Sequence, residues 1–470
     1  MVKSNFMKWL LPLVCFFLPI AVSAQSISQK LQKAFQQFES DSQLKHAISS
    51  LYVIDAATGK VVFDKNSQIG LAGASTQKII TAATAFELLG KEYRYKTEFS
   101  HHHGEVTGMI LAVYGNGDPT FGSWRFNSTR DSVIFNNLIK AMKQDGYTKF
   151  DNIHMSVNDD SRNIPSGWIY EDIANYYGAA SYSLNWHENQ YEFNFNPGKK
   201  VGDKATLISD STNSWRWKYI RNECKTGPIG SGDNAYIYFI PGSRDILIQG
   251  TVPLGGNKFT ISGADIDPIT NFSFSFIDYA EKKGIEFIKK TSGKSQFSTE
   301  YDNMVKSLSF YSHYSPSLDS IIYWFLKKSI NLYGEALIKT FAYEKQGFGS
   351  TDSGVAIVKK FWKDKGLDAD ELNLYDGSGL SPLNRITTHA QVEVLKYAKT
   401  KDWFPYFYDA LPEYNGMKMK SGTISDVKGF CGYHKAKDGK EYIFSFLVNN
   451  YNGKTSGLVS KMYKVLDELK

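Results

Sequence analysis

A short polar stretch followed at once by an apolar one restricts how this chain can fold. Ser75 and Lys78 form a Ser-x-x-Lys pattern. An apolar run with helical spacing follows and ends at Gly90; its members on one face are Ile79, Ile80, Ala83 and Phe86. The spacing predicts a buried helix with Ser75 at its N-terminus and Lys78 one turn further on. A lysine amine there can activate a serine hydroxyl without a histidine. Taken alone, however, the pattern is better explained as a helix cap followed by a surface lysine.

The first 24 residues have the composition of a cleaved export signal. Lys3 and Lys8 make a basic start, residues 9–22 are apolar, and small residues end at Ala24. The apolar run is short and contains two prolines, which argues against a membrane span. We therefore expect a periplasmic protein, cleaved after Ala24, with at most peripheral membrane association.

The composition and charge exclude several kinds of partner. The net charge of +6, or +4 without the signal, is weak and no block of Lys or Arg stands out, so nucleic-acid binding is not indicated. Three adjacent histidines, residues 101–103, cannot all face one ion from a strand, and we expect no metal and no cofactor. Cys224 and Cys431 have no metal-ligand spacing, and whether they pair is left open.

Helical and strand patterns near both chain ends predict one mixed domain. The expected strands are 47–55, 60–64, 417–420, 429–434 and 442–449, and the expected helices are 27–38, 267–283, 317–341 with a short break, 353–365 and 457–469. From about Glu98 short β-like runs predominate, with one helix expected at 131–144. We therefore expect an α/β (α+β) domain from residues 25–97 and 263–470. A β-rich insertion of one or two subdomains, 98–262, would interrupt it.

Two further short motifs lie downstream. Ser329 and Asn331 form a Ser-x-Asn pattern after a long apolar helix, where a tight turn would present a hydroxyl and an amide. Lys420 precedes Ser421 and Gly422 at the end of a predicted strand, where the glycine would let a substrate backbone approach closely. Each motif alone is also explained by a helix–helix connection or by an edge-strand lysine.

In this order, and in an exported chain, the three motifs are those of penicillin-binding proteins and serine β-lactamases. The sequence resembles most the low-molecular-mass class C penicillin-binding proteins, the D-alanyl-D-alanine carboxypeptidase/endopeptidase family, whose members also carry a large insertion between the first two motifs. Matching stretches are 74–78, 115–119, 167–168, 329–335, 376–381 and 420–423, and they span nearly the whole mature chain. The chain departs from the family pattern at Ser421, where Thr is commoner, and at Gly334, where Ala is usual.

The resemblance implies a fold and an activity. The fold is the serine β-lactamase/penicillin-binding transpeptidase-like domain, an antiparallel sheet flanked by helices. The activity is hydrolysis of D-Ala-D-Ala bonds in peptidoglycan stem peptides, with D,D-endopeptidase activity on crosslinks. It implies an acyl-enzyme on Ser75, which β-lactam antibiotics would also acylate.

The resemblance also implies roles for the motif residues. Lys78 would be the base, Ser329 a proton relay to the leaving amine, and Asn331 a ligand of the substrate amide. The substrate carboxylate would be bound within Lys420, Ser421, Gly422 and Thr423. The N–H groups of Ser75 and Thr423 would form the oxyanion hole.

A stretch of the insertion resembles the part of this family that receives the free amino end of a diaminopimelate side chain. Trp168 and Tyr176 would be its walls, and the carboxylate of Glu171 would bind the ammonium. Packing of these aromatic side chains against the main domain explains the stretch equally well.

Two other functions stay open on the sequence. A serine β-lactamase has the same fold, although it would lack this long insertion and no deacylating base can be identified. A peptidoglycan-binding scaffold without catalysis would not need the intact motif residues.

Overall fold

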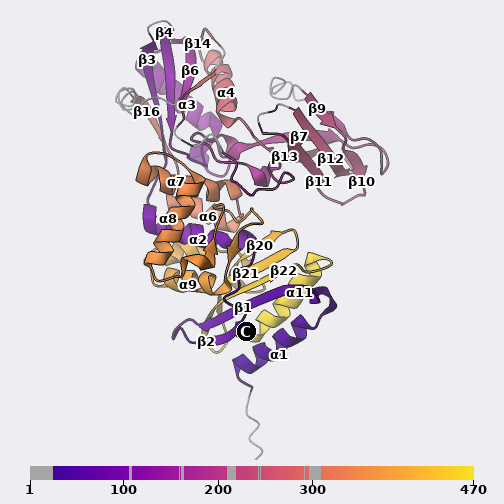
Figure 1. Ribbon diagram of the computed structural model, residues 1–470. Coiled ribbons are helices and arrows are strands. Elements are labelled where there is room, and N and C mark those ends of the chain that lie inside the picture. Colours follow the sequence, from indigo (N-terminus) through magenta and orange to yellow (C-terminus); the bar gives the residue numbers. More distant parts are fainter. Residues whose placement is uncertain are drawn as a thin grey trace, which may run out of the picture.

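The computed structural model describes most of the chain after the predicted signal, which lies outside the described residues. The described residues are 25–104, 108–157, 159, 163–208, 219–241, 243, 245–289, 292–295 and 309–470. They form a sheet-and-helix domain built from both chain ends and an inserted part above it (Figure 1). Across these ranges, we find no helix with the length and apolar character needed to span a bilayer.

A six-stranded sheet joins the two ends of the chain. Its order is β19 (Glu413–Tyr414), β20 (Met417–Ile424), β21 (Val427–Lys435), β22 (Glu441–Asn449), β1 (Ile48–Asp55) and β2 (Val61–Lys65). All neighbouring strands are antiparallel. The predicted strands at both chain ends are therefore confirmed.

Both faces of this sheet are covered, and the alternation of side chains along β1 shows why. Leu51 and Val53 pack with the terminal helices α1 (Ile27–Glu39) and α11 (Thr455–Leu466), whereas Tyr52 and Ile54 point into the larger core on the opposite face. Side chains alternate between the faces of a strand, so a strand apolar at every position is buried on both.

The larger core is built from central helices (Figure 1). They are α2 (Lys78–Leu89), α6 (Leu318–Lys327), α7 (Asn331–Gln346), α8 (Thr351–Asp364), α9 (Thr388–Lys399) and α10 (Phe404–Ala410). A two-stranded ribbon of β17 (Leu372–Asn373) and β18 (Arg385–Ile386) lies among them. The break predicted within 317–341 falls at residues 328–330, between α6 and α7.

The first inserted subdomain has its own sheet and core. The sheet order is β15 (Ser292–Ser295), β6 (Asn152–Ser156), β4 (Gly108–Gly115), β3 (Lys96–Gly104) and β16 (Ser309–Tyr314). Helices α3 (Asp131–Gln144) and α4 (Pro268–Lys282) pack on this sheet, and the short strands β5 (Lys149–Phe150) and β14 (Glu286–Phe287) pair beside it.

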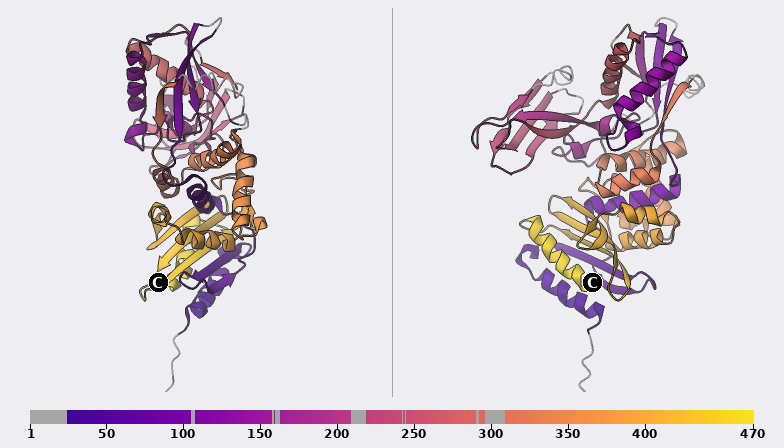
Figure 2. Two further views of the ribbon diagram at one scale, coloured as in Figure 1. Left: turned by 90° about the vertical axis from the view of Figure 1, so that its left-hand side faces the viewer. Right: turned by 180° about the vertical axis from the view of Figure 1, so that it is seen from behind.

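The second inserted subdomain is all β. It contains β7 (Gln190–Asn196), β8 (Thr206–Ile208) and β13 (Phe259–Ala264) in one sheet, and β9 (Tyr219–Asn222), β10 (Lys225–Gly227), β11 (Asn234–Phe239) and β12 (Asp245–Pro253) in another. It projects sideways from the long axis of the molecule (Figure 2). Its core is separate from that of the first subdomain.

The predicted end of the insertion, at residue 262, is wrong. Phe272 and Phe276 of α4 lie in the same core as Phe99 of β3, and β16 pairs with β3. The core of the main domain resumes only at Leu318. An amphipathic helix shows in its sequence that one face is buried, but not which core buries it.

The two cysteines singled out in the sequence are not paired with each other. Cys224 and Cys431 are both free and buried, in two different cores. No cluster of three or more His, Cys, Asp or Glu side chains suited to a metal ion occurs within the described ranges.

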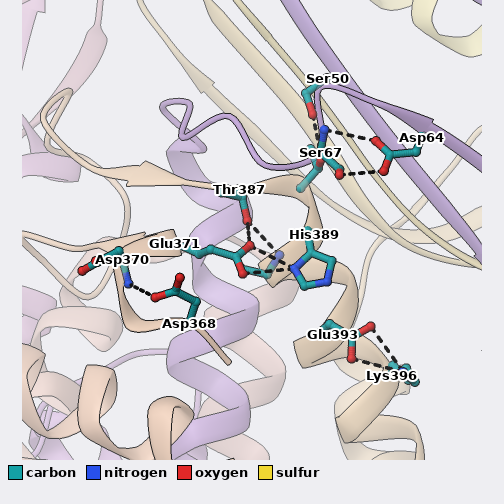
Figure 3. A network of polar contacts seen from close by, with 12 residues as sticks. Ser50, Asp64, Ser67, Asp368, Asp370, Glu371, Thr387, His389, Glu393 and Lys396 are labelled. Atoms are coloured by element: carbon teal, nitrogen blue, oxygen red, sulfur yellow. Dashed lines mark hydrogen bonds and ion pairs between the residues drawn. The ribbon is translucent and has the colours of Figure 1, made fainter. Parts of the chain in front are cut away.

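A polar network ties the helical region to the edge of the six-stranded sheet (Figure 3). His389 Nδ1 lies 3.0 Å from a carboxylate oxygen of Glu371, which also accepts a hydrogen bond from Thr387. The hydrogen bond to Glu371 is the main cause that raises the pKa of His389; the charges of Glu393 and Asp64 act in the same direction.

This network makes stability depend on pH. Because the pKa of His389 is raised on folding, its contribution is full below the unfolded value of about 6.5 and is lost as pH rises through the folded value. We expect His389→Gln to lower the unfolding free energy by about 1–2 kcal/mol at pH 5.5, and by less at pH 9. Chemical denaturation at the two pH values measures this, with the exposed His46→Gln as control. An equal loss at both would contradict it.

Candidate active site

Ser75 lies in a tight turn that leads into α2. The turn is a 3₁₀ helix, and the α-helix itself begins at Lys78, so the predicted helix is confirmed but starts one turn later. Ala74 has φ of 46°, a left-handed conformation that is uncommon for a residue with a side chain. A Cβ on Gly422 would lie only 2.9 Å from the backbone nitrogen of Ser75. The glycine therefore allows β20 to press against this turn.

The amine of Lys78 is completely buried beneath the serine. Its Nζ lies 2.9 Å from Ser75 Oγ, 2.6 Å from Asn331 Oδ1 and 2.7 Å from the carbonyl oxygen of Ser378. The amide of Asn331 is oriented by its Nδ2, which donates to the carbonyl of Tyr177 at 2.7 Å. Burial, and secondly the charge of Lys420, hold the pKa of Lys78 well below its usual range.

A neutral amine can satisfy these three contacts. A neutral lysine has two N–H donors and one lone pair. The oxygens of Asn331 and Ser378 can only accept, so they take both donors, and the lone pair is left facing the hydroxyl of Ser75. This is the arrangement in which Lys78 can remove the proton of Ser75.

A second lysine–serine pair faces the first from the other side of the site. Ser329 lies between α6 and α7 with φ of 59°, which confirms the predicted tight turn. Lys420 Nζ donates to Ser329 Oγ at 2.9 Å and to the carbonyl of Ser421 at 2.8 Å. Burial is the main cause that lowers the pKa of Lys420 to about 7, and the charge of Lys428 contributes.

Lys428 is a residue of this site that the sequence analysis missed. It lies opposite Thr423 in the β20–β21 pair, and its Nζ donates to the Thr423 hydroxyl at 2.8 Å. Burial lowers its pKa to about 8. A lysine inside an otherwise apolar strand was the available signal, because buried lysines need a specific partner.

The stretch 376–381 shapes the floor of the site. The fully buried Asp376 accepts hydrogen bonds from several surrounding groups. These donors are the Gln77, Asn384 and Trp168 side chains and the N–H groups of Gly379 and Ser381. The carboxylate thereby fixes the loop whose Ser378 carbonyl binds Lys78. The sequence marked this stretch by resemblance but gave no role to Asp376.

Close backbone packing holds the same loop against α7. A Cβ on Gly334 would lie 2.8 Å from the carbonyl oxygen of Gly377. The N–H of Gly377 donates to the carboxylate of Glu335 at 3.2 Å. Burial, and secondly the charge of Asp376, raise the pKa of Glu335 to about 8. The departure from the family at Gly334 thus lies at a steric contact point, although it removes no functional group.

A cleft of about 560 Å³ opens above Ser75. Of the predicted site residues, Ser75, Ser329, Asn331, Thr423, Glu171 and Tyr176 line it. Ser421 and Gly422 lie behind it in β20. Trp168 is not one of its walls, because its indole N–H donates to Asp376 at 2.9 Å.

Comparison with known proteins identifies the family of the chain. Residues 29–413 match the D-Ala-D-Ala carboxypeptidase 3 (S13) family. The chain belongs to this family. It is 26% identical over 448 residues to the D-alanyl-D-alanine carboxypeptidase of Actinomadura sp. (strain R39), covering 88% of this chain and 80% of that relative. It is 22% identical over 437 residues to the D-alanyl-D-alanine carboxypeptidase DacB of Haemophilus influenzae, covering 86% of this chain and 85% of the relative.

The S13 family assignment agrees with the fold. The crystal structure of penicillin binding protein 4 (dacB) from Haemophilus influenzae superposes with a TM-score of 0.75 at 16% identity, covering 93% of this chain and 98% of that one. The predicted fold class and the predicted enzyme class, a serine-type D-Ala-D-Ala carboxypeptidase, are confirmed.

The two lysine charges near β20 predict a shift in pH dependence. Lys428 lowers the pKa of Lys420, so Lys428→Met should raise it. If protonated Lys420 is needed to attract an anionic ligand, the alkaline limb of the rate of Ser75 acylation by benzylpenicillin moves to higher pH. Stopped-flow measurement of acylation between pH 5.5 and 9.5 tests this. The exposed Lys454→Met is the control, and an unshifted limb in Lys428→Met would contradict the coupling.

Proposed function

We propose that this protein hydrolyses D-Ala-D-Ala bonds of peptidoglycan stem peptides and also opens D,D-crosslinks, through an acyl-enzyme on Ser75. The observation that carries the proposal is the contact of 2.9 Å between Ser75 Oγ and the buried amine of Lys78. Its two other contacts are acceptors, so in the neutral form of Lys78 the lone pair faces the hydroxyl. A serine activated in this way attacks a carbonyl carbon.

Acylation needs two proton transfers. Lys78 takes the hydroxyl proton as Ser75 Oγ forms a bond to the carbonyl carbon of the penultimate D-Ala. The C–N bond then breaks, and the leaving nitrogen receives a proton from Ser329, which Lys420 resupplies across their hydrogen bond of 2.9 Å. The proton held by Lys78 then returns through solvent to Lys420, which leaves Lys78 neutral again. Water attacks the ester carbon while Lys78 accepts a proton from the water, and Lys78 passes this proton to Ser75 Oγ as the C–O bond breaks, which releases the peptide acid and restores the serine.

The strand β20 supports charge binding beside the serine. Lys420 and Thr423 lie on β20, and Lys428 of the neighbouring strand β21 donates to the Thr423 hydroxyl. In their protonated forms the two lysines attract the terminal carboxylate of the peptide. The oxyanion hole would use the N–H groups of Ser75 and Thr423. Such a donor typically contributes about 3–4 kcal/mol to transition-state stabilisation.

The acidic end of the cleft suits an ammonium group on the substrate. Glu171 and Asp172 line it together with Tyr176, Tyr177 and Tyr236. A carboxylate between aromatic rings is a suitable site for the amino end of a diaminopimelate side chain. Trp168 would act there indirectly, because its hydrogen bond to Asp376 holds the preceding loop in place.

We also expect inhibition by β-lactams and a periplasmic location. A relative from Dictyostelium discoideum, 24% identical over 377 residues, is named a penicillin-sensitive carboxypeptidase A, which supports acylation of Ser75 by β-lactams here. Peptidoglycan as substrate and the signal-like sequence of residues 1–24 support a periplasmic location.

Removal of the nucleophile tests the proposal directly. We expect Ser75→Ala to abolish stable labelling by a fluorescent penicillin and hydrolysis of defined muropeptides. Lys78→Met should slow both by about 10²–10⁴-fold, the usual contribution of a general base. Mass spectrometry should detect D-Ala release from pentapeptide monomers and conversion of crosslinked dimers to monomers.

The same assays separate the alternatives. Fast release of hydrolysed penicillin, with muropeptides unchanged, would indicate a β-lactamase. Absence of any label on the wild-type protein would indicate a non-catalytic scaffold. The exposed Ser456→Ala serves as the matched control, and its labelling should equal that of the wild type.

A further inference from the structure

One cation in the cleft has no role in the mechanism above. Arg125 comes from the insertion and lines the same cleft as Ser75 and Ser329. The exposed Lys328 also lines this cleft, whereas Glu171 and Asp172 make the acidic part of the lining. The cleft is thus lined by side chains of both charges. The proposed function assigns a ligand to the acidic side chains but none to Arg125 and Lys328.

The guanidinium of Arg125 is held in place from behind. Its Nε and Nη2 donate to the two carboxylate oxygens of Glu188 at 2.7 and 3.1 Å. Glu188 is fully buried and also accepts from the hydroxyls of Ser123 and Tyr333, at 2.7 and 2.9 Å. A fork fixed in this way loses little freedom when it binds a further anion.

The backbone around Glu188 is unusual in a way that serves this contact. His187, Glu188 and Asn189 have consecutive φ values of 53°, 52° and 49°. Three residues in succession with left-handed backbone are costly and persist only where the surroundings impose them. The turn aims the Glu188 carboxylate inward at Arg125.

One edge of the guanidinium is left for a ligand. Within the part of the chain that the structure describes, Nη1 donates no hydrogen bond. The group lies 5.4 Å from the ring centre of Trp124 and 5.5 Å from that of Trp324, and its side chain is 19% exposed. Lys328, which forms no ion pair with any described residue, adds an uncompensated positive charge nearby. A carboxylate is the ligand that such a fork and charge favour.

The position of Arg125 points to the leaving half of the substrate. Trp324 precedes Lys328 and Ser329 by about one helical turn on α6, and Ser329 is the proposed donor to the leaving nitrogen. Phe126, the next residue, lines a second groove of about 500 Å³ together with Trp324, Tyr323 and Tyr406. Adjacent residues, Arg125 and Phe126, therefore line the cleft and this second groove.

We propose that Arg125 binds a free carboxylate on the leaving half of a crosslinked peptide and so favours D,D-endopeptidase over carboxypeptidase action; this inference rests on the proposed function. The leaving group in carboxypeptidase action is a single D-Ala, whose only carboxylate is bound beside Lys420. A crosslinked leaving group continues into a second stem peptide. That peptide carries further carboxylates on its γ-linked glutamate and at its C-terminus.

The test compares two reactions within each variant. For wild type, Arg125→Gln and the exposed Arg130→Gln control, kcat/KM is measured for D-Ala release from a pentapeptide monomer and for cleavage of a crosslinked dimer. We expect Arg125→Gln to lower dimer cleavage by about tenfold or more, the scale of a lost charge-assisted hydrogen bond, with monomer hydrolysis changed less than about twofold. Arg125→Lys keeps the charge without the fork and should be intermediate.

The ratio of the two rates does not depend on how much of a variant is folded, and benzylpenicillin labelling counts the active sites. Two amidated dimers identify the carboxylate, one amidated at the glutamate of the leaving half and one at its C-terminus. Wild type should cleave one of them more slowly than the unmodified dimer, and Arg125→Gln should not discriminate.

The remaining outcomes distinguish a failure of this inference from a failure of the proposed function. Equal losses on monomer and dimer in Arg125→Gln, or equal cleavage of all three dimers by the wild type, would overturn the role of Arg125 while the proposed function stands. Hydrolysis of monomer without dimer would refute the endopeptidase activity and this inference with it. A wild type that is labelled but hydrolyses neither substrate would refute the proposed function itself.

Discussion

The candidate active site is organised around one amine buried inside the protein. A charged ammonium without a counter-ion is very costly to bury, so Lys78 at full burial favours its unprotonated form. Asn331 and Ser378, which come from distant parts of the chain, supply acceptors for its two N–H groups. Removing either acceptor would leave a buried donor unsatisfied, so the Ser75 turn, the α6–α7 turn and the 376–381 loop must be built as one unit.

Close backbone contacts hold that unit together. Gly422 brings β20 onto the Ser75 turn, and Gly334 and Gly377 bring α7 onto the loop. At each contact a Cβ would fall inside van der Waals distance of backbone atoms. Asp376 then fixes the loop by accepting several hydrogen bonds in a buried place, where each is electrostatically stronger than in water. These residues can therefore be essential without contacting the substrate.

Much of the secondary structure was predictable because its elements carry local signals. The apolar strands of the six-stranded sheet, and the helices α3 and α4, follow from periodicity and turn residues. The three motifs could be placed near each other only by resemblance, since no local pattern brings Ser75, Ser329 and Lys420 together. What could not be predicted depends on tertiary partners. Three features are of this kind: α4 packs in the inserted core, the indole of Trp168 donates to Asp376, and Lys428 is buried beside Thr423. In each case the sequence is compatible with more than one packing arrangement.

The discontinuity of the main domain has a consequence for how the protein reaches its structure. Ile54 of β1 pairs with Ile443 of β22, so the central strand pair closes a loop that contains almost the whole molecule. The inserted part closes a shorter loop, where Lys96 pairs with Tyr314. Loop closure favours the nearer contacts, and slow long-range pairings leave apolar strands unpaired for longer. We therefore expect the insertion to fold first, bringing the two ends of the interrupted domain side by side and serving as the template on which the catalytic part assembles.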